Sequence, residues 1–447
     1  MTAYWAADVQ LSTGMAHRVR FRVDDGIFSS IEIDTAPASG DERLSGVVLP
    51  GLANAHSHAF HRALRGRTNS HGGSFWTWRD QMYGVAGRLN PDSYRDLARA
   101  LYLEMALAGI TVVGEFHYLH QGPGGVPYAD PNAMGTSLIE AAQEVGIRIT
   151  VLDACYLSGG LTGDGHQPVA GVQQRFSDRD PDAWAIRVDA LRSAAQTAAS
   201  TVKIGAAAHS VRALPAASLA RMAELVGDQT MHVHLSEQPA ENAATQAFYG
   251  CSPTELLYRS GLVGAHTTTV HATHLTSLDI ALLGGARVTC CFCPTTERDL
   301  ADGIGPARRL LDAGSPLSLG SDSHAVVDGF EEIRGLEMHE RLRSGERGRF
   351  RPDELIESAS RSGYRCLGWT TGGEIAVGGL ADFVTVRRDS VRTAGSAPDQ
   401  IVFSATAADI DRVVVAGTTI VRDGSHRSGP VAPLLIRAID QVTGPQP

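Results

Sequence analysis

Eight short apolar runs alternate with longer helical patterns between residues 47 and 323, and this alternation restricts the possible folds more than any other feature. The runs have the β-branched and apolar composition of buried strands. The stretches between them repeat apolar residues every three or four positions, as amphipathic helices do. Eight strand–helix units are the pattern of a (β/α)8 barrel. The runs span 47–58, 111–118, 148–156, 203–210, 229–237, 267–275, 287–294 and 316–323, and the clearest helical stretches span 93–109, 132–146, 214–227 and 330–343.

A doubly wound α/β sheet also alternates strands and helices. That fold carries a glycine-rich phosphate-binding turn between its first strand and helix. Here the glycine-rich segment 122–125 precedes no helical pattern and follows no suitable strand turn. We therefore predict an α/β protein built on a (β/α)8 TIM-like barrel.

The two ends of the chain contain short alternating runs without helices between them. RFRVDDGIFSSIEID near the start and RVVVAGTTIVRDG near the end are β-hairpin signals, the second with a turn at Ala416-Gly417. We expect a small β-sandwich domain assembled from both termini, residues 1–48 and 373–447. The catalytic barrel domain would then be residues 49–372.

Composition excludes several classes of protein. With 39 Lys and Arg against 49 Asp and Glu, the formal net charge of −10 argues against a general nucleic-acid binder. A chain that is 43% hydrophobic and 20% charged is not disordered. No run of about 18 apolar residues occurs and the start has no signal-peptide pattern, so we expect a cytoplasmic protein without a membrane partner.

The six cysteines include the cluster Cys290, Cys291 and Cys293, whose short spacing could suit a metal. The cluster lies in an apolar run that alternates like a buried strand, and there is no second pair of closely spaced cysteines. Free cysteine usually behaves as a small core residue. We predict that these thiols pack in the core.

Polar side chains gather at the carboxyl-terminal ends of the predicted strands. In a barrel these ends meet at one mouth, where active sites are built. A His-x-His pair on a strand places both imidazoles on one face, and with a third histidine and a carboxylate it suits Zn²⁺ or a similar ion with one position open for water. A single histidine is more often structural, but several strand ends in order favour a metal. The residues are His56, His58, Glu115, His117, Tyr118, His209, His232, His234, Glu237, His271, His274 and Asp322.

These motifs resemble the amidohydrolase superfamily, with HSH on strand one, HVHLSE on strand five, VHATHL on strand six and GSDSH on strand eight. FWTWRD, EFHYLH and CPTTE narrow the resemblance to the formimidoylglutamate deiminases of histidine degradation. The matching stretches run from about residue 49 to 325, and AVGGLADFV and VVVAGTTIVRDG resemble the superfamily's β-sandwich.

The resemblance implies that His56, His58, His234 and Asp322 hold one divalent metal ion, zinc. Binuclear members carry a carboxylated lysine at the end of strand four, whereas here Lys203 lies at its start and His209 near its end. The ion would activate a water for attack on a C=N carbon. The catalytic residues would be Glu237, which protonates the nitrogen, His271, which orients the water, and Asp322, which accepts its proton. Glu237 would also suit the exposed start of a helix.

The resemblance also implies a small-molecule substrate with carboxylates. Arg79 and Arg212 would grip these carboxylates with paired hydrogen bonds, helped by Tyr118 and His209. His61 stands where the family usually has glutamine. Its imidazole can also donate a hydrogen bond to the substrate, or the change could mark a different substrate. Phe75, Trp76 and Trp78 could form a lid, a dimer contact or a packed loop.

The implied reaction is hydrolysis of N-formimidoyl-L-glutamate to N-formyl-L-glutamate and ammonia by a homodimer. One alternative is a related deaminase that acts on a guanine, cytosine or triazine ring, which would not need Arg79 and Arg212. A non-catalytic scaffold is the other alternative. Such a paralogue would be expected to lose metal ligands, and here all four are present together with Glu237 and His271.

Overall fold

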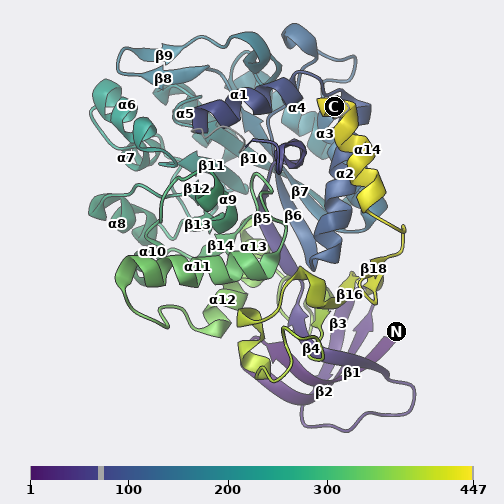
Figure 1. Cartoon of the computed structure of the whole chain (residues 1–447). Coiled ribbons are helices and arrows are strands. Elements are labelled where there is room, and N and C mark those ends of the chain that lie inside the picture. The colour runs from purple at the N-terminus through teal and green to yellow at the C-terminus, as the bar shows by residue number, and fades with distance from the viewer. Residues whose placement is uncertain (1, 69–74, 445–447) are drawn as a thin grey trace.

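The computed structural model describes residues 2–68 and 75–444. Its centre is a parallel eight-stranded sheet in the order β14-β13-β12-β11-β10-β7-β6-β5, and a bridge between Ser57 and Asp322 joins the two edge strands. The predicted barrel is therefore confirmed (Figure 1). The strands are β5 (Leu52–Ser57), β6 (Ile110–His117), β7 (Arg148–Cys155), β10 (Val202–Ser210), β11 (Met231–Leu235), β12 (Thr267–His271), β13 (Thr289–Phe292) and β14 (Leu317–Leu319).

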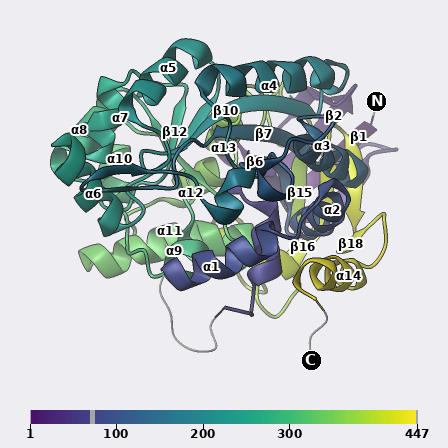
Figure 2. The ribbon, with the colours of Figure 1, turned by 90° about the horizontal axis from the view of Figure 1, so that it is seen from above.

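Helices surround the barrel, as the view from above shows (Figure 2). α2 illustrates the local causes: the Asn90 side chain accepts the Ser93 N–H at 2.9 Å, and Leu97, Leu101 and Met105 form a fully buried stripe. The helices are α1 (Phe75–Ala86), α2 (Pro91–Leu107), α3 (Ala133–Val145), α4 (Pro181–Ala194), α5 (Ala216–Val226), α6 (Pro239–Tyr249), α7 (Pro253–Arg259), α8 (Ser277–Gly285), α9 (Pro294–Asp299), α10 (Ala307–Ala313), α11 (Gly329–Ser344), α12 (Pro352–Ala359), α13 (Arg361–Cys366) and α14 (Ala432–Thr443).

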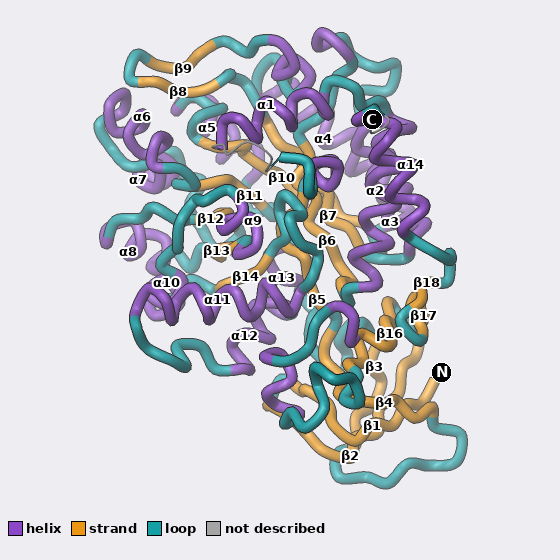
Figure 3. Tube along the Cα trace, in the orientation of Figure 1, coloured by secondary structure: helices purple, strands orange, loops and turns teal. Residues whose placement is uncertain are grey.

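The two ends of the chain build a second eight-stranded sheet, at the foot of the barrel in Figures 1 and 3. Ile27 pairs with Leu380, and the sheet encloses a separate core in which the rings of Tyr4, Phe21, Phe28 and Phe383 pack together. The expected small β-rich unit from both termini is confirmed. Its strands are β1 (Thr2–Leu11), β2 (Gly14–Asp24), β3 (Ile27–Glu32), β4 (Glu42–Pro50), β15 (Phe383–Val386), β16 (Ile410–Val415), β17 (Thr418–Arg422) and β18 (Ser425–His426).

The run at 47–58, predicted as one strand, is two strands. β4 belongs to the small sheet and β5 to the barrel, and the chain changes sheets at Gly51. A Cβ at Gly51 would lie 2.3 Å from Thr111 Oγ1, so the close approach at this junction requires glycine. The apolar pattern continues across the junction because both strands are buried there.

Other features follow the sequence more closely. The hairpin predicted at Ala416-Gly417 joins β16 to β17, and both turn residues have positive φ. The last helix, α14, differs from these features: its residues fall in the range 373–447 expected for the small β-rich domain, and it lies along α2 beside the barrel (Figure 1). Cys290, Cys291 and Cys293 are fully buried, as predicted for core residues. None of the helices in the described residues is long and apolar enough to cross a membrane.

Candidate metal centre and active site

The site residues predicted from the sequence converge at the carboxyl-terminal ends of the barrel strands. They surround one cavity of about 300 Å³. Eleven residues were predicted as metal ligands, catalytic groups or substrate contacts. Ten of them line the cavity, and the eleventh, His56, is fully buried just behind the lining. The lining residues among them are His58, His61, Arg79, Tyr118, His209, Arg212, His234, Glu237, His271 and Asp322.

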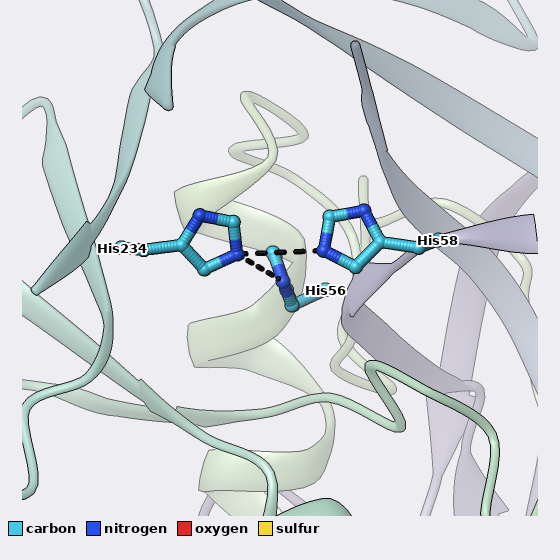
Figure 4. Close-up of side chains that lie close together, drawn as sticks. All are labelled: His56, His58 and His234. Atoms are coloured by element: carbon cyan, nitrogen blue, oxygen red, sulfur yellow. Dashed lines mark hydrogen bonds between the residues drawn. The ribbon is translucent and has the colours of Figure 1, made fainter. Parts of the chain in front are cut away.

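Three imidazoles point toward one another (Figure 4). His56 lies on β5, His58 directly follows β5, and His234 lies on β11. Nε2 of His234 lies 3.1 Å from Nε2 of His56 and 3.4 Å from Nε2 of His58. Oδ1 of Asp322 lies 3.5 and 3.4 Å from the same nitrogens of His56 and His58. Four atoms held tetrahedrally at about 2.0–2.1 Å from a zinc ion would be about 3.3–3.4 Å apart. These four separations are close to that edge length, so the four side chains can surround a single metal ion.

Backbone carbonyls fix the tautomers of two of these histidines. Nδ1 of His58 lies 2.9 Å from the Phe116 carbonyl oxygen, and Nδ1 of His234 lies 2.8 Å from that of His209. Because a carbonyl oxygen can only accept, each Nδ1 must carry the hydrogen, which leaves the lone pair on Nε2 facing the centre. Burial lowers the pKa of His56, His58 and His234, which favours the neutral form that binds metal. The residues present fit a divalent ion.

Glu237 and His271 border this centre. Nε2 of His271 lies 3.7 Å from Oε1 of Glu237 and 3.7 Å from Oδ2 of Asp322, so the three predicted catalytic groups are neighbours. Burial lowers the pKa of His271, but the carboxylates of Glu237, Asp322 and Glu297 outweigh burial and raise this pKa well above its ordinary value. Glu237, His271 and Asp322 are therefore close enough to one another to exchange protons beside the metal centre.

Arg212 is engaged by two carboxylates. Its Nη2 donates to Oε2 of Glu237 at 3.0 Å, and its Nε lies 2.8 Å from Oε2 of Glu241. Glu241 also accepts the Ser236 N–H at 2.8 Å and is almost fully buried. No motif marks Glu241 in the sequence, because its ion pair forms only when the start of α6 lies beside Arg212. Arg212 reaches the cavity, but its charge is shared with Glu237 and Glu241.

Arg79, by contrast, contacts aromatic rings and has no carboxylate partner among the described residues. Its guanidinium carbon lies 4.5 Å from the Trp76 ring centre and 5.4 Å from that of Tyr83, and no carboxylate in residues 2–68 or 75–444 is recorded within ion-pair distance of it. Phe75, Trp76 and Trp78 lie on α1 and line the same cavity. Of the guanidinium groups that line the cavity, Arg79 is the freer to bind an anion.

His61, Tyr118 and His209 form one wall of the cavity. Nε2 of His61 lies 2.9 Å from the Tyr118 hydroxyl, whereas His61 Nδ1 has no hydrogen-bond partner among the described residues. The His209 ring packs edge-on against Tyr118 and Tyr156. Burial keeps the pKa of His61 and His209 well below the ordinary value and that of Tyr118 well above it. These groups are uncharged hydrogen-bonding partners.

His117, His120 and Asp153 form a second buried group of possible metal ligands. Both oxygens of Asp153 accept from Arg187, at 2.7 and 2.8 Å, and His120 Nε2 donates to the Ala154 carbonyl oxygen at 2.9 Å. A guanidinium in this position competes with a cation. The group therefore stabilises the packing of α4 against β7.

Comparison with known proteins places these observations in context. Residues 47–420 match the model of the amidohydrolase family. The chain is 36% identical over 442 residues to formimidoylglutamate deiminase of Pseudomonas aeruginosa, covering 95% of this chain and 96% of that protein. It is 30% identical to 8-oxoguanine deaminase of the same species, covering 88% and 86%. The crystal structure of an amidohydrolase from Brucella melitensis superimposes with a TM-score of 0.92 at 30% identity, covering 99% and 100% of the two chains.

Proposed function

Because this chain belongs to the amidohydrolase family, we propose that it hydrolyses N-formimidoyl-L-glutamate to N-formyl-L-glutamate and ammonia. The observation that carries the proposal is a cluster of three imidazoles and one carboxylate beside Glu237, in a cavity that two guanidinium groups also line. The 36% identity to a formimidoylglutamate deiminase over nearly the whole chain supports it.

His56, His58, His234 and Asp322 would hold one divalent ion, and the N₃O donor set suits zinc. Such an ion supplies an activated water near neutral pH, because it lowers the pKa of water from about 15.7 to about 7. The tautomers held by the Phe116 and His209 carbonyls keep the ligand nitrogens available without reorganisation.

The remaining chemistry is proton transfer by this chain's own side chains. Water adds its oxygen to the formimidoyl carbon, the carbon–nitrogen bond to the terminal nitrogen breaks, and ammonia leaves. Glu237 donates a proton to that nitrogen and regains one from the hydroxyl of the addition product as this becomes the formyl oxygen. Asp322 accepts a proton from the attacking water and returns it to the leaving ammonia. His271, 3.7 Å from both carboxylates, stabilises the negative charge that develops on oxygen.

The two carboxylates of the substrate account for the cationic and hydroxyl groups farther from the metal centre. Arg79 is free to form a paired hydrogen bond with one carboxylate. The other groups of the substrate would contact further residues that line the same cavity, namely Arg212, Tyr118, His209 and His61.

The first experiment is ammonia release by the zinc-loaded protein from N-formimidoyl-L-glutamate, tested beside N-formimidoyl-L-aspartate, guanine, cytosine and 8-oxoguanine. We expect rapid release from formimidoylglutamate and little from the rest. Protein that binds zinc but acts only on another compound would overturn the substrate assignment and leave the site chemistry in place.

The aromatic walls of the cavity, including Phe75, Trp78 and Tyr156, favour a heterocyclic base as the second candidate substrate. A neutral ring has no carboxylate for Arg79 to bind, so the effect of Arg79→Ala on activity separates the two candidate substrates.

A scaffold without activity would fail to retain zinc after supplementation and dialysis. The cytoplasmic location and the homodimer stay predictions, to be checked by fractionation and light scattering.

A further inference from the structure

The short helix α9 lies beside the proposed catalytic groups, and none of its residues has yet been given a role in the reaction. It follows β13, and its Thr295 N–H donates to Oε2 of Glu332 on α11 at 3.0 Å. Glu332 is 4% exposed and also accepts from the Thr295 hydroxyl. α9 is therefore fixed to the outer helix layer at its first turn.

Thr296, the next residue, holds the segment that carries Asp322. Its Oγ1 donates to the Ser321 carbonyl oxygen at 3.1 Å and accepts the Ser323 N–H at 3.1 Å. These two residues flank Asp322, whose φ of +44° lies in the left-handed region that non-glycine residues rarely adopt. The contacts stabilise an unfavourable backbone conformation at a proposed metal ligand.

Glu297, the third residue of the same turn, faces His271. Its side chain is buried, and Oε1 accepts the Cys293 N–H at 2.8 Å, which fixes the carboxylate in place. The same Oε1 lies 3.5 Å from Nδ1 of His271, and that nitrogen has no closer partner among the described residues. His271 also has a left-handed backbone, with φ of +70°.

Taking the proposed function as its basis, we propose that Glu297 is a positioning residue that accepts the Nδ1 hydrogen of His271 and so directs Nε2 toward the reacting atoms. A carboxylate can only accept from Nδ1, so Nε2 is left facing Glu237 and Asp322. The 3.5 Å separation is of the length that shortens when a catalytic site binds its substrate. Glu297 itself touches neither substrate nor metal ligand in this arrangement.

The test compares Glu297→Ala, Glu297→Gln and the control Glu337→Gln, each as zinc-loaded full-length protein. Glutamine keeps an acceptor oxygen, so Glu297→Gln should retain most of kcat, whereas Glu297→Ala should lose about 10- to 100-fold in kcat with little change in KM or zinc content. Glu337→Gln alters a buried carboxylate on α11 that accepts the N–H groups of Gly348 and Phe350, and it should keep kcat near wild type. Equal losses in Glu297→Gln and Glu297→Ala, or unchanged kcat in Glu297→Ala, would overturn the proposal.

A second measurement separates positioning from a general loss of structure and from failure of the proposed substrate. In protein with ¹⁵N-labelled histidine, the Nδ1 signal of His271, assigned by its loss in His271→Asn, reports whether that nitrogen carries the hydrogen. At a pH high enough for the His271 ring to carry a single hydrogen, we expect that hydrogen on Nδ1 in wild type and Glu297→Gln and on either nitrogen in Glu297→Ala. The same signal in all three proteins would overturn the positioning role, even if no ammonia were released from formimidoylglutamate.

Discussion

Arg79 and Arg212 line one cavity, but their different contacts predict different kinetic effects. Arg79 has no recorded carboxylate partner in the described part of the chain, so Arg79→Ala should raise KM for formimidoylglutamate about 10- to 100-fold with kcat nearly unchanged. Arg212 holds Glu237 and Glu241, so Arg212→Ala should also lower kcat, because two buried carboxylates lose their shared cation.

Steady-state ammonia release measures both parameters, with Arg221→Ala as the control. Arg221 is 44% exposed and pairs with Asp182 on the outer surface, so its loss should change neither kcat nor KM. If Arg79→Ala and Arg212→Ala had the same ratio of kcat to KM effects, the assignment of separate roles would be wrong.

His61 contacts the Tyr118 hydroxyl at 2.9 Å, a bond that glutamine can replace and alanine cannot. His61→Gln should keep KM within about threefold of wild type, whereas His61→Ala should raise KM about tenfold, the cost of one hydrogen bond. Activity assays on both variants check this, and a His61→Gln variant as weak as His61→Ala would show that the imidazole itself is needed.

Most of the candidate site could be predicted from the sequence, because the carboxyl-terminal ends of the strands lie on one face of a barrel. That argument covers His56, His58, His234 and His271, which lie on or directly after the predicted strands. It could not reveal that Arg212 is held by Glu241, since the contact depends on how α6 packs. The roles of Thr296 and Glu297 were hidden for the same reason, because α9 contacts residues from three different strand ends.

At the scale of elements, the barrel closes where β14 meets β5, and this closure sets the metal centre. The His56 carbonyl oxygen accepts the N–H groups of Ser321 and Asp322 at 3.1 and 3.0 Å. The apolar runs predicted both strands, but the extent of β14, only Leu317–Leu319, depends on this local pairing. Likewise, the division of the run at 47–58 into β4 and β5 depends on the close packing of Gly51 against Thr111.

Gly320→Ala tests whether this closure positions a metal ligand. A Cβ at Gly320 would lie 2.7 Å from the His56 Cβ and 2.8 Å from its carbonyl oxygen, so backbone must shift. We expect zinc affinity to fall about tenfold and the free energy of unfolding of the metal-free protein to fall by about 1–3 kcal/mol. Chelator competition and urea unfolding measure the two effects.

Gly285→Ala is the matched control, because no atom lies within 4 Å of its Cβ position at the end of α8. Its zinc affinity should equal that of wild type. Wild-type zinc affinity in Gly320→Ala would show that the β14–β5 contact does not determine the position of His56.

At the scale of the whole molecule, one buried carboxylate joins the barrel to the small sheet. Asp382 precedes β15, and its oxygens accept from Arg148 at the start of β7 at 2.7 and 3.1 Å. The Tyr364 hydroxyl and the Ala416 N–H donate to the same carboxylate at 2.8 and 2.7 Å. Both charged side chains are almost fully buried. The four bonds thus connect barrel, α13 and two segments of the small sheet.

Asp382→Ala should lower the free energy of unfolding by about 3–5 kcal/mol, because Arg148 is left buried without a counter-charge. Arg148 begins β7, so this ion pair lies at the opposite end of the barrel from the metal centre, where residues serve stability. At a temperature where the variant remains folded, its kcat, KM and zinc content should therefore equal those of wild type.

Urea unfolding measures the stability loss, with Asp182→Ala as the control. That variant breaks an exposed ion pair with Arg221 and should lower the free energy of unfolding by less than about 1 kcal/mol. Loss of zinc or of kcat in folded Asp382→Ala would instead mean that the small sheet controls the active site through the barrel.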